Sequence, residues 1–350
     1  MTRQSLALAG VLAIGAAVAV VPAIVSGQSK PNATSSAQAS GWKTPRTAGG
    51  QPDLQGVWDY RTVTPFERPK ELAGKPVLSD QEAAEFERQL NRSQNRDLVD
   101  AKKGGAGYAP ESQGGVVPYN EFWYDRGDKI LADKRTSLIV DPPDGLLPPR
   151  TPDGAKRAAA AAEENRRAQM GHPHADSYLD RPLQERCIIW PGSTLPMRPT
   201  AYNNNVQLIQ GDGYVAIVNE MIHEHRLVPL DGRPHAEEGI TQWLGDARGH
   251  WEADTLVVET TNFRIRGDGS PAAPGERMRV TERFTRTGPS TLVYRFTVDD
   301  PATWTRPWTA ELFMNKTSDH IYEYACHEGN SAIVGVLGGA RVEEKKTVSR

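Results

Sequence analysis

The sequence has little net charge and few recognisable catalytic motifs. Its 41 basic and 44 acidic residues leave a formal charge of −3, which gives no electrostatic basis for binding nucleic acid or an anionic membrane surface. It contains no nucleophile elbow, P-loop, dinucleotide fingerprint or classical zinc-ligand motif, so we expect no nucleotide cofactor. The glycine-rich stretch 104–110 does not join a strand to a helix as a phosphate-binding loop requires. The motifs therefore do not identify a reaction.

Long apolar runs are missing after the N-terminus. Arg3 precedes an uncharged apolar stretch over 6–25, and small residues at its end offer a cleavage site before Gln28. The alternative is an uncleaved membrane anchor, because about twenty apolar residues can just span a bilayer. We expect residues 1–27 to be a signal peptide, residues 28–50 a flexible leader, and the cleaved chain to have no stable membrane span. The mature protein is then predicted to be periplasmic or secreted.

Cysteine is scarce, and Cys187 and Cys326 are the only two. In the oxidising compartment that export implies, an even pair usually forms one disulfide. The bridge would close a loop of about 140 residues, which the chain-entropy model values at roughly 4–5 kcal/mol. Two other states remain open: a pair of free thiols, or a reactive thiol beside His327 as its base.

The chain divides near residue 195, and the first part is irregular. Residues 51–195 are predicted to form an α+β segment that packs on a β core. The clearest helix spans 78–95, where Ser79 can be the N-cap and Glu82 completes a capping box. A second, alanine-rich helix is expected over 151–170. Short strands are expected at the start of 54–69, at 129–132 and at 136–140.

Residues 196–345 have the pattern of an antiparallel β core. Short strands alternate with turns, and hairpins are predicted around Gly211-Asp212-Gly213, 252–254, Gly288-Pro289 and 316–319. The 32 glycines and 26 prolines of the chain also suit a turn-rich β protein. We expect a mainly β fold, in which an antiparallel meander closes into a lipocalin-like barrel or a sandwich with a few peripheral helices. The last strand of this meander is expected to carry "DHIYEYACHEGN".

Six blocks of the sequence are distinctive: "RTSLIVDPPDG", "YNNNVQLIQ", "VPLDGRPH", "GHWEADTLVVETTNF", "VDDPATWTRPWTAE" and "YEYACHEGN". Together they resemble a large uncharacterised family of exported bacterial proteins over about residues 50–345. The resemblance implies export, and it implies no reaction, cofactor or catalytic residue. The strand pattern is also similar to lipocalin-like barrels, a likeness of fold alone, and such barrels carry ligands or catalyse reactions depending on their sites.

Two histidines in "NEMIHEHR" (219–226) form a candidate metal site. On a strand, His223 and His225 would point to one face, as in β-barrel sites where a neighbouring strand supplies a third ligand to a divalent metal. The sequence does not choose that ligand among Glu220, Glu282, Glu311, His320 and His327. Two alternatives remain: a structural role with one histidine bonded across strands, and acid–base catalysis without a metal.

Glu282 is a candidate catalytic residue because it shares a strand face with apolar residues. An unpaired carboxylate there would be costly, so it must be exposed at an edge, protonated or paired. Its candidate partners are His223, Arg226 and Arg283. A buried pair of His223 with Glu282, or with Glu220 as the acidic partner, would be an acid–base device with shifted pKa values. The alternative is a salt bridge that fixes strand register.

A ligand cavity is expected between the hairpin at 203–226 and the strands that carry Glu282 and Tyr324. The candidate ligand-binding residues are Asn203, Asn204, Arg226, Tyr324 and His327. For the two asparagines the alternative is a turn, in which amides bond to nearby backbone. For the last segment the alternative is a structural end strand tied back by Cys326.

Three classes of function remain. The first, which we prefer, is a cavity-bearing barrel that binds a small, partly apolar molecule. The second is a periplasmic lyase, isomerase or hydrolase that uses His223 with an acidic partner, with or without a metal, so enzyme status stays open. The third is a structural protein of the envelope. An apolar cavity would favour the first class, a buried His–Glu group the second and a filled barrel the third.

Overall fold

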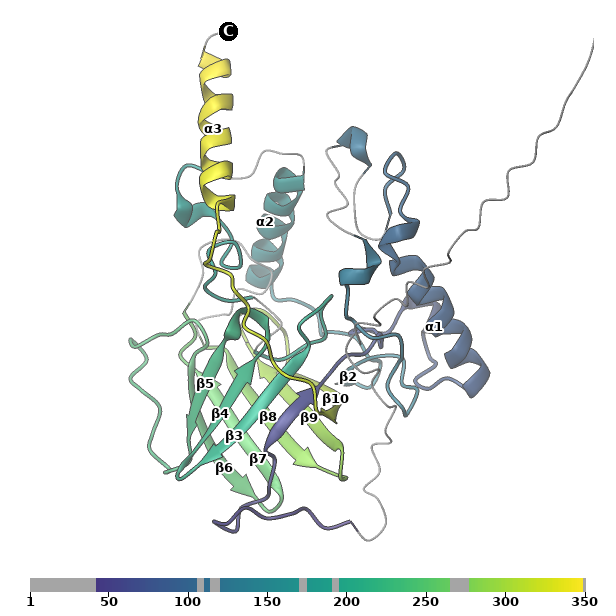
Figure 1. Ribbon diagram of the computed structural model, residues 1–350, viewed down its shortest axis with the longest axis vertical. Helices are drawn as coiled ribbons and strands as arrows, with labels where there is room; N and C mark the ends of the chain where they lie inside the picture. Colours follow the sequence, from purple (N-terminus) through teal and green to yellow (C-terminus); the bar gives the residue numbers. More distant parts are fainter. Residues whose placement is uncertain are drawn as a thin grey trace, which may run out of the picture.

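The computed structural model describes residues 42–105, 110–113, 120–169, 175–190, 195–264 and 277–348. Together they form a mainly β protein built around one large antiparallel sheet (Figure 1). The predicted signal peptide and most of the predicted leader lie outside the described residues. In this described part of the chain, no helix combines the length and the apolar character needed to cross a membrane.

The described residues contribute ten strands to the sheet. Nine of them form one path in the order β5-β4-β3-β1-β10-β9-β8-β7-β6, and β2 pairs with β10 beside it. Their bounds are β1 Gly56–Asp59, β2 Ile139–Asp141, β3 Asn205–Gly211, β4 Tyr214–Asn219, β5 His225–Pro229, β6 Asp246–Glu252, β7 Thr255–Thr261, β8 Arg279–Arg286, β9 Thr291–Asp299 and β10 Trp308–Thr317.

The sheet curls until its two end strands come into contact. Every neighbouring pair on the nine-strand path is antiparallel. Because the number of strands is odd, the end strands β5 and β6 run parallel to each other. They lie close together, yet no hydrogen-bonded ladder joins them within the described chain. The fold is therefore a barrel-like sheet that is left open along one seam between β5 and β6.

A glycine on β6 allows the two end strands to approach. A Cβ atom at Gly249 would lie 2.7 Å from Cδ2 of Leu230 and 2.8 Å from Cγ1 of Val228. Both distances are shorter than a van der Waals contact between carbon atoms, which is about 3.5–4.0 Å. A side chain at position 249 would therefore require Leu230 and Val228, or the strand that carries Val228, to shift.

Three predicted hairpins are confirmed. Gly211-Asp212-Gly213 connects β3 to β4, residues 252–254 connect β6 to β7, and Gly288-Pro289 lies between β8 and β9. On β9 the predicted alternation also holds, because Leu292, Tyr294, Phe296 and Val298 are all buried. Short turns and a two-residue period are local signals, so the sequence alone can show them.

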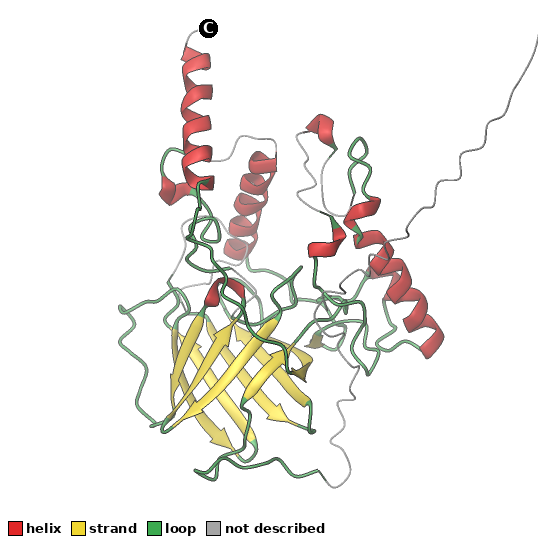
Figure 2. Ribbon diagram, viewed as in Figure 1, coloured by secondary structure: helices red, strands yellow, loops and turns green. Residues whose placement is uncertain are grey.

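The helices lie outside the sheet, mostly beyond one end of it (Figure 2). They are α1 Asp80–Gln94, α2 Pro152–Gln169 and α3 Ala332–Val348, with short 3-10 helices at Lys70–Leu72, Arg96–Leu98, Glu111–Gln113, Glu121–Trp123, Tyr178–Asp180 and Met221–His223. The predicted cap of α1 is confirmed, because Glu82 accepts the backbone N–H of Ser79 at 3.0 Å and donates its own to the Ser79 hydroxyl. Thr151 caps α2 by accepting the N–H of Gly154 at 3.0 Å.

Two strands of the sheet come from the segment predicted to pack outside it. β1 lies between β3 and β10 in the middle of the path, and β2 pairs with β10. The expected strand at 129–132 is wrong. That stretch bonds instead to the loop after β1, through the N–H of Val63 on the Lys129 carbonyl and the N–H of Leu131 on the Thr64 hydroxyl.

The predicted hairpin at 316–319 and the strand after it are wrong. β10 continues to Thr317, the segment 318–331 is irregular, and α3 follows. The reason is a lack of space in the sheet. β1 already pairs with the end of β10, where Val57 faces Thr317 and Asp59 faces Asn315. A strand returning from β10 would find that position occupied.

Aromatic side chains fill the middle of the barrel. Trp58, Phe284, Tyr294 and Phe296 are almost completely buried. The ring centroids of Phe284 and Tyr294 lie 5.0 Å apart, and those of Tyr294 and Phe296 lie 5.4 Å apart. These are the spacings of packed aromatic pairs, so side chains occupy the space that the sheet encloses.

Candidate functional site

A buried ion pair lies inside the barrel beside the seam. Arg226 on β5 donates two hydrogen bonds to the carboxylate of Glu282 on β8, at 2.5 and 2.9 Å. Glu282 is 0% exposed and Arg226 is 5% exposed. Burial alone would lower the pKa of Arg226, but the Glu282 carboxylate holds it above its ordinary value. Among the three partners predicted for Glu282, the structure selects Arg226.

Tyr294 on β9 completes this buried network. Its hydroxyl donates to Glu282 at 2.7 Å and accepts the backbone N–H of Met197 at 3.1 Å. Burial and the nearby carboxylate raise the pKa of Tyr294 well above its ordinary value, so the phenol keeps its proton. Both oxygens of Glu282 are thereby bonded within the chain, which favours a structural role over proton transfer.

Arg226 also lines a cavity of about 740 Å³, which we call the seam cavity. The cavity lies where β5 and β6 begin, between residues 222–229 and 241–248, with 187–189 and Arg264 completing its wall. It includes part of the hairpin that was expected to line a ligand site. Glu282 and Tyr324, which were also expected there, are not among its lining residues.

Two residues of the seam cavity have an unusual backbone. Cys187 and Ile222 both have φ of +54°. This left-handed conformation is uncommon for residues other than glycine and rare for β-branched residues such as isoleucine. Ile222 is also almost fully buried. Strained backbone of this kind costs about 1–3 kcal/mol per residue and is concentrated at functional sites. Its presence twice in one cavity wall marks the seam cavity as the leading candidate site.

The carboxylate of Asp246 is bonded within the cavity wall. It accepts hydrogen bonds from the Ala236 N–H at 3.0 Å, from Nδ1 of His235 at 3.0 Å and from Arg248 at 2.7 Å. Burial opposes ionisation, but these three donors outweigh it and lower the pKa of Asp246. Glu224 accepts the N–H of Trp190 at 2.8 Å.

The apolar part of the wall surrounds a tryptophan. Ile188, Ile189, Leu227 and Leu244 line the cavity together with Trp243. The guanidinium of Arg264 lies 4.7 Å from the Trp243 ring centroid, a cation–π contact that holds the indole in place. The cavity therefore offers an aromatic face and aliphatic groups to a ligand.

The predicted disulfide is confirmed and supports this wall. Cys187 and Cys326 are bonded, with their Cα atoms 5.7 Å apart. Asn330 adds a hydrogen bond to the Glu185 carbonyl at 3.2 Å. The irregular segment 318–331 is thereby attached to the loop that carries Ile188 and Ile189. A disulfide is typical of an oxidising compartment.

The two predicted metal-ligand histidines do not share a strand. Met221–His223 forms a 3-10 helix, and β5 begins only at His225. The left-handed backbone of Ile222, directly before His223, keeps this short helix out of the strand. The predicted arrangement with both histidines on one strand face is therefore wrong. His225 is exposed at the seam cavity, the side chain of His223 lies outside the described part, and no group of three or more possible metal ligands occurs among the described residues.

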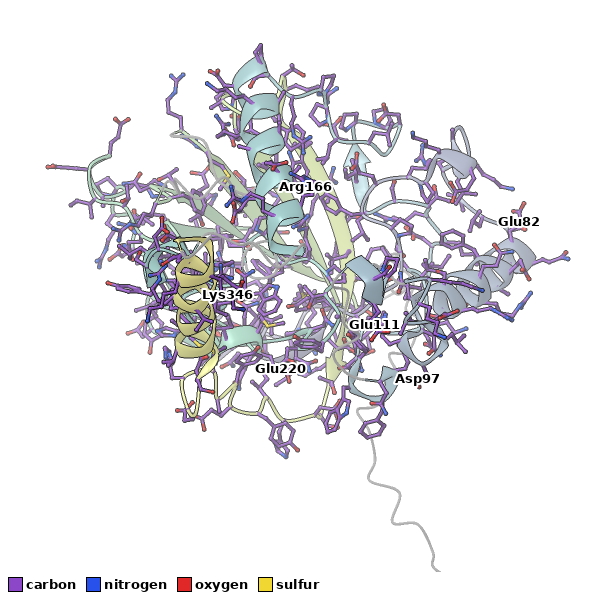
Figure 3. All side chains as sticks on the ribbon, turned by 90° about the horizontal axis from the view of Figure 1, so that it is seen from above. Glu82, Asp97, Glu111, Arg166, Glu220 and Lys346 are labelled. Atoms are coloured by element: carbon purple, nitrogen blue, oxygen red, sulfur yellow. A yellow bond between two sulfur atoms is a disulfide. The ribbon has the colours of Figure 1, made fainter. Side chains whose placement is uncertain are left out.

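Glu220 lies away from the seam cavity, in a buried polar group. Its carboxylate accepts the backbone N–H and the side-chain amide of Asn205, at 3.2 and 3.0 Å. Burial raises the pKa of Glu220, and Asp125 adds to the effect while Arg61 opposes it. Figure 3 shows Glu220 among crowded side chains near the middle of the molecule, whereas Glu82 lies at its edge.

The other predicted ligand-binding residues are scattered. Asn203 has φ of +58°, and Asn204 bonds to the backbone of Thr200 and Asp125, so both support a turn. Tyr324 and His327 belong to the irregular segment before α3, where Tyr324 is half-buried and His327 is exposed. The structure brings none of these four to the seam cavity.

Sequence reasoning missed the β6 side of the cavity. Trp243 lies in the long connection after β5, Asp246 begins β6 and Arg264 follows β7, and no motif connects them. The one available signal was the length of the connection between β5 and β6. Antiparallel neighbours can be joined by a short turn, whereas strands that run parallel, as these two do, need a longer crossover. Comparison with known proteins adds no residue roles, because no protein-family model and no curated protein matches the chain.

Proposed function

We propose that the protein binds a small, partly apolar molecule in the seam cavity, in the periplasm or after secretion. The observation that carries this proposal is the difference between the charged and the apolar side chains of the cavity wall. Three of the charged groups in the wall, Arg226, Asp246 and Arg248, are bonded to partners in the chain, and aliphatic side chains and an indole line the cavity beside them. A volume of 740 Å³ lies within the usual range of small-molecule sites, about 300–1,000 Å³.

The ligand that suits this wall is uncharged over most of its surface. A charged group would have to compete with Glu282 for Arg226, or with three donors for Asp246. An apolar or aromatic body would instead be stabilised by burial, at about 25 cal/mol for each Å² removed from water. Trp243 provides a flat face on which a planar ligand can stack.

The disulfide and the N-terminal sequence support the proposed location. Cys187 and Cys326 form a bond that persists in oxidising compartments. The apolar segment 6–25 has the features of an export signal. Membership of the exported bacterial family stays a prediction.

A structural role in the envelope is the second candidate. The filled interior of the barrel favours it, because aromatic side chains occupy the space that a lipocalin-like barrel uses for its ligand. The buried pair of Arg226 and Glu282 would then serve the fold alone. Ligand binding at the seam distinguishes the two candidates.

The proposal is tested with N-phenyl-1-naphthylamine, a neutral probe that fluoresces in apolar surroundings. Titration of the mature, disulfide-bonded protein should give saturable fluorescence. Leu227→Glu places a charge on a side chain that lines the cavity and is 60% exposed, so the fold should tolerate it. We expect this change to weaken probe binding at least tenfold.

Ile209→Glu is the matched control. Ile209 lies on β3, is 41% exposed and does not line the seam cavity. This variant should bind the probe as the unchanged protein does. Absence of saturable binding, or equal binding by both variants, would contradict the proposal and leave the structural role preferred.

A further inference from the structure

Three arginines line the seam cavity, and they differ in what holds their charge. Arg226 forms an ion pair with Glu282, and Arg248 forms one with Asp246. The Arg264 side chain instead lies against an indole, and no carboxylate within the described chain forms an ion pair with it. Arg264 is therefore the arginine of this wall whose charge is available to a ligand.

Backbone and amide hydrogen bonds hold Arg264 at the cavity. Its N–H donates to the Gln242 carbonyl at 2.7 Å, and the Gln242 N–H donates to the Asn262 carbonyl at 3.1 Å. The side-chain amide of Asn262 donates to three carbonyls in 236–240, at 3.0, 3.0 and 3.2 Å. Arg264 is thereby attached to the connection between β5 and β6, which carries Trp243.

The contact with Trp243 orients the guanidinium. The Cζ atom of Arg264 lies 4.7 Å from the centroid of the indole. A guanidinium that lies on a ring through its face can still donate from the N–H groups at its edge, and two of these match the two oxygens of a carboxylate. Arg264 lines the cavity and is also exposed to solvent, which places these donors at the cavity mouth.

The rest of the wall suits an apolar body. Its lining contains two carboxylates, Glu224 and Asp246, and both accept hydrogen bonds from the chain. A ligand anion close to either carboxylate would be repelled, whereas the aliphatic side chains of the wall favour an apolar group. The place for an anionic group is therefore beside Arg264, with the apolar body directed inward.

We propose that the ligand of the seam cavity is a flat acid with one negative charge, whose carboxylate accepts paired hydrogen bonds from Arg264 while its apolar ring system lies inside. A few placed polar groups in a mainly apolar site fix the orientation of a ligand in this way. This inference rests on the proposed function and deepens it, because it names the class of ligand and the residue that selects it.

The test is displacement of N-phenyl-1-naphthylamine from the full disulfide-bonded chain by 2-naphthoate and by 2-naphthamide. The two competitors share one ring system and one size, and they differ in charge. Because the mouth is solvated, the ion pair contributes modestly, and we expect the acid to bind at least about threefold more tightly than the amide.

Arg264→Gln removes the charge, and the ratio of the two affinities should then fall to about one. The ratio is the readout because a shift of Trp243 would change the binding of both competitors alike. Arg264→Lys keeps the charge without the paired donors, so its ratio should lie between those of the unchanged protein and Arg264→Gln. If circular dichroism shows that Arg264→Gln does not fold, the lowered ratio in Arg264→Lys carries the test.

Arg279→Gln is the matched control. Arg279 begins β8, is exposed and does not line the cavity, so this variant removes the same charge and should keep the ratio of the unchanged protein.

Three outcomes would overturn this inference alone: no displacement by the acid, a ratio below about threefold, or an equal fall of the ratio in Arg264→Gln and Arg279→Gln. An unchanged ratio in folded Arg264→Gln would also overturn it. Absence of saturable probe binding would overturn the proposed function as well, so the two failures are distinguishable.

Discussion

The guanidinium of Arg226 and the carboxylate of Glu282 meet inside the barrel across its open seam. Arg226 lies on β5 at one end of the sheet, and Glu282 lies on β8, the third strand from the other end. Their N···O distances are 2.5 and 2.9 Å. Because no described ladder joins β5 to β6, this pair is a polar connection between the two sides of the seam.

Breaking that pair should destabilise the protein strongly. In Glu282→Gln the buried guanidinium of Arg226 loses its counter-charge, and Tyr294 loses a charged acceptor. Removing one partner of a buried pair costs about 3–5 kcal/mol. Urea unfolding followed by tryptophan fluorescence should show a loss of this size in the free energy of unfolding.

Two further variants control for this measurement. Replacing both partners by apolar residues, Arg226→Met with Glu282→Leu, should restore most of the lost stability, because no charge is then buried alone. Asp231→Asn breaks an exposed pair with Arg233 and should produce no measurable change. A loss below about 1 kcal/mol in Glu282→Gln would show that water reaches Arg226 and that the pair is not a buried connection.

The disulfide should contribute most of the stability of the irregular segment before α3. Cys187→Ser with Cys326→Ser should lower the free energy of unfolding by about 2–5 kcal/mol, because the bond closes a long loop. Hydrogen exchange should rise in 318–331, which has no strand in the sheet, while β8 and β9 stay protected. Equal exchange in both forms would show that the contacts of Asn330 suffice without the bond.

Local patterns of the sequence predicted much of the fold. Ser79 and Glu82 indicated the start of α1, and the turn residues indicated three hairpins, two of them with glycine, because caps and turns depend on residues close together in the chain. Glu282 on an apolar strand face also indicated a buried partner. The choice of Arg226 among three candidates needed the three-dimensional structure.

Long-range pairing could not be predicted in the same way. β1 inserts between β3 and β10, and this insertion removes the place for a strand after Thr317. Nothing near residue 57 in the sequence indicates that pairing. The sequence also does not indicate the left-handed conformation of Ile222, because β-branched residues disfavour that conformation. These two features explain why the predicted histidine site and the last strand were wrong.

Stability should depend on pH through Glu220. Burial raises the pKa of this carboxyl above its ordinary value of 4.5, so its favourable contribution is complete below that value and is lost as pH rises through the raised pKa. Glu220→Gln cannot ionise and can still accept from Asn205. Between about pH 4 and about pH 8, the stability of the variant should therefore rise relative to that of the unchanged protein.

Thermal unfolding of both proteins across this pH range measures the difference. Glu237→Gln, which changes an exposed carboxylate outside this buried group, is the control and should follow the unchanged protein at every pH. If the difference in stability between Glu220→Gln and the unchanged protein is the same at every pH, the hydrogen bonds from Asn205 compensate fully for the effect of burial on the pKa of Glu220.

Gly249 should limit how closely the seam can close. In Gly249→Ala the new methyl group would meet Leu230 at 2.7 Å and Val228 at 2.8 Å, so these side chains or β5 itself must shift. Overpacking of this kind costs about 1–3 kcal/mol, and urea unfolding should show it. Gly288→Ala is the matched control, because its nearest neighbour would be Thr291 at 3.6 Å. If both variants are equally stable, the seam is flexible and β5 moves without cost.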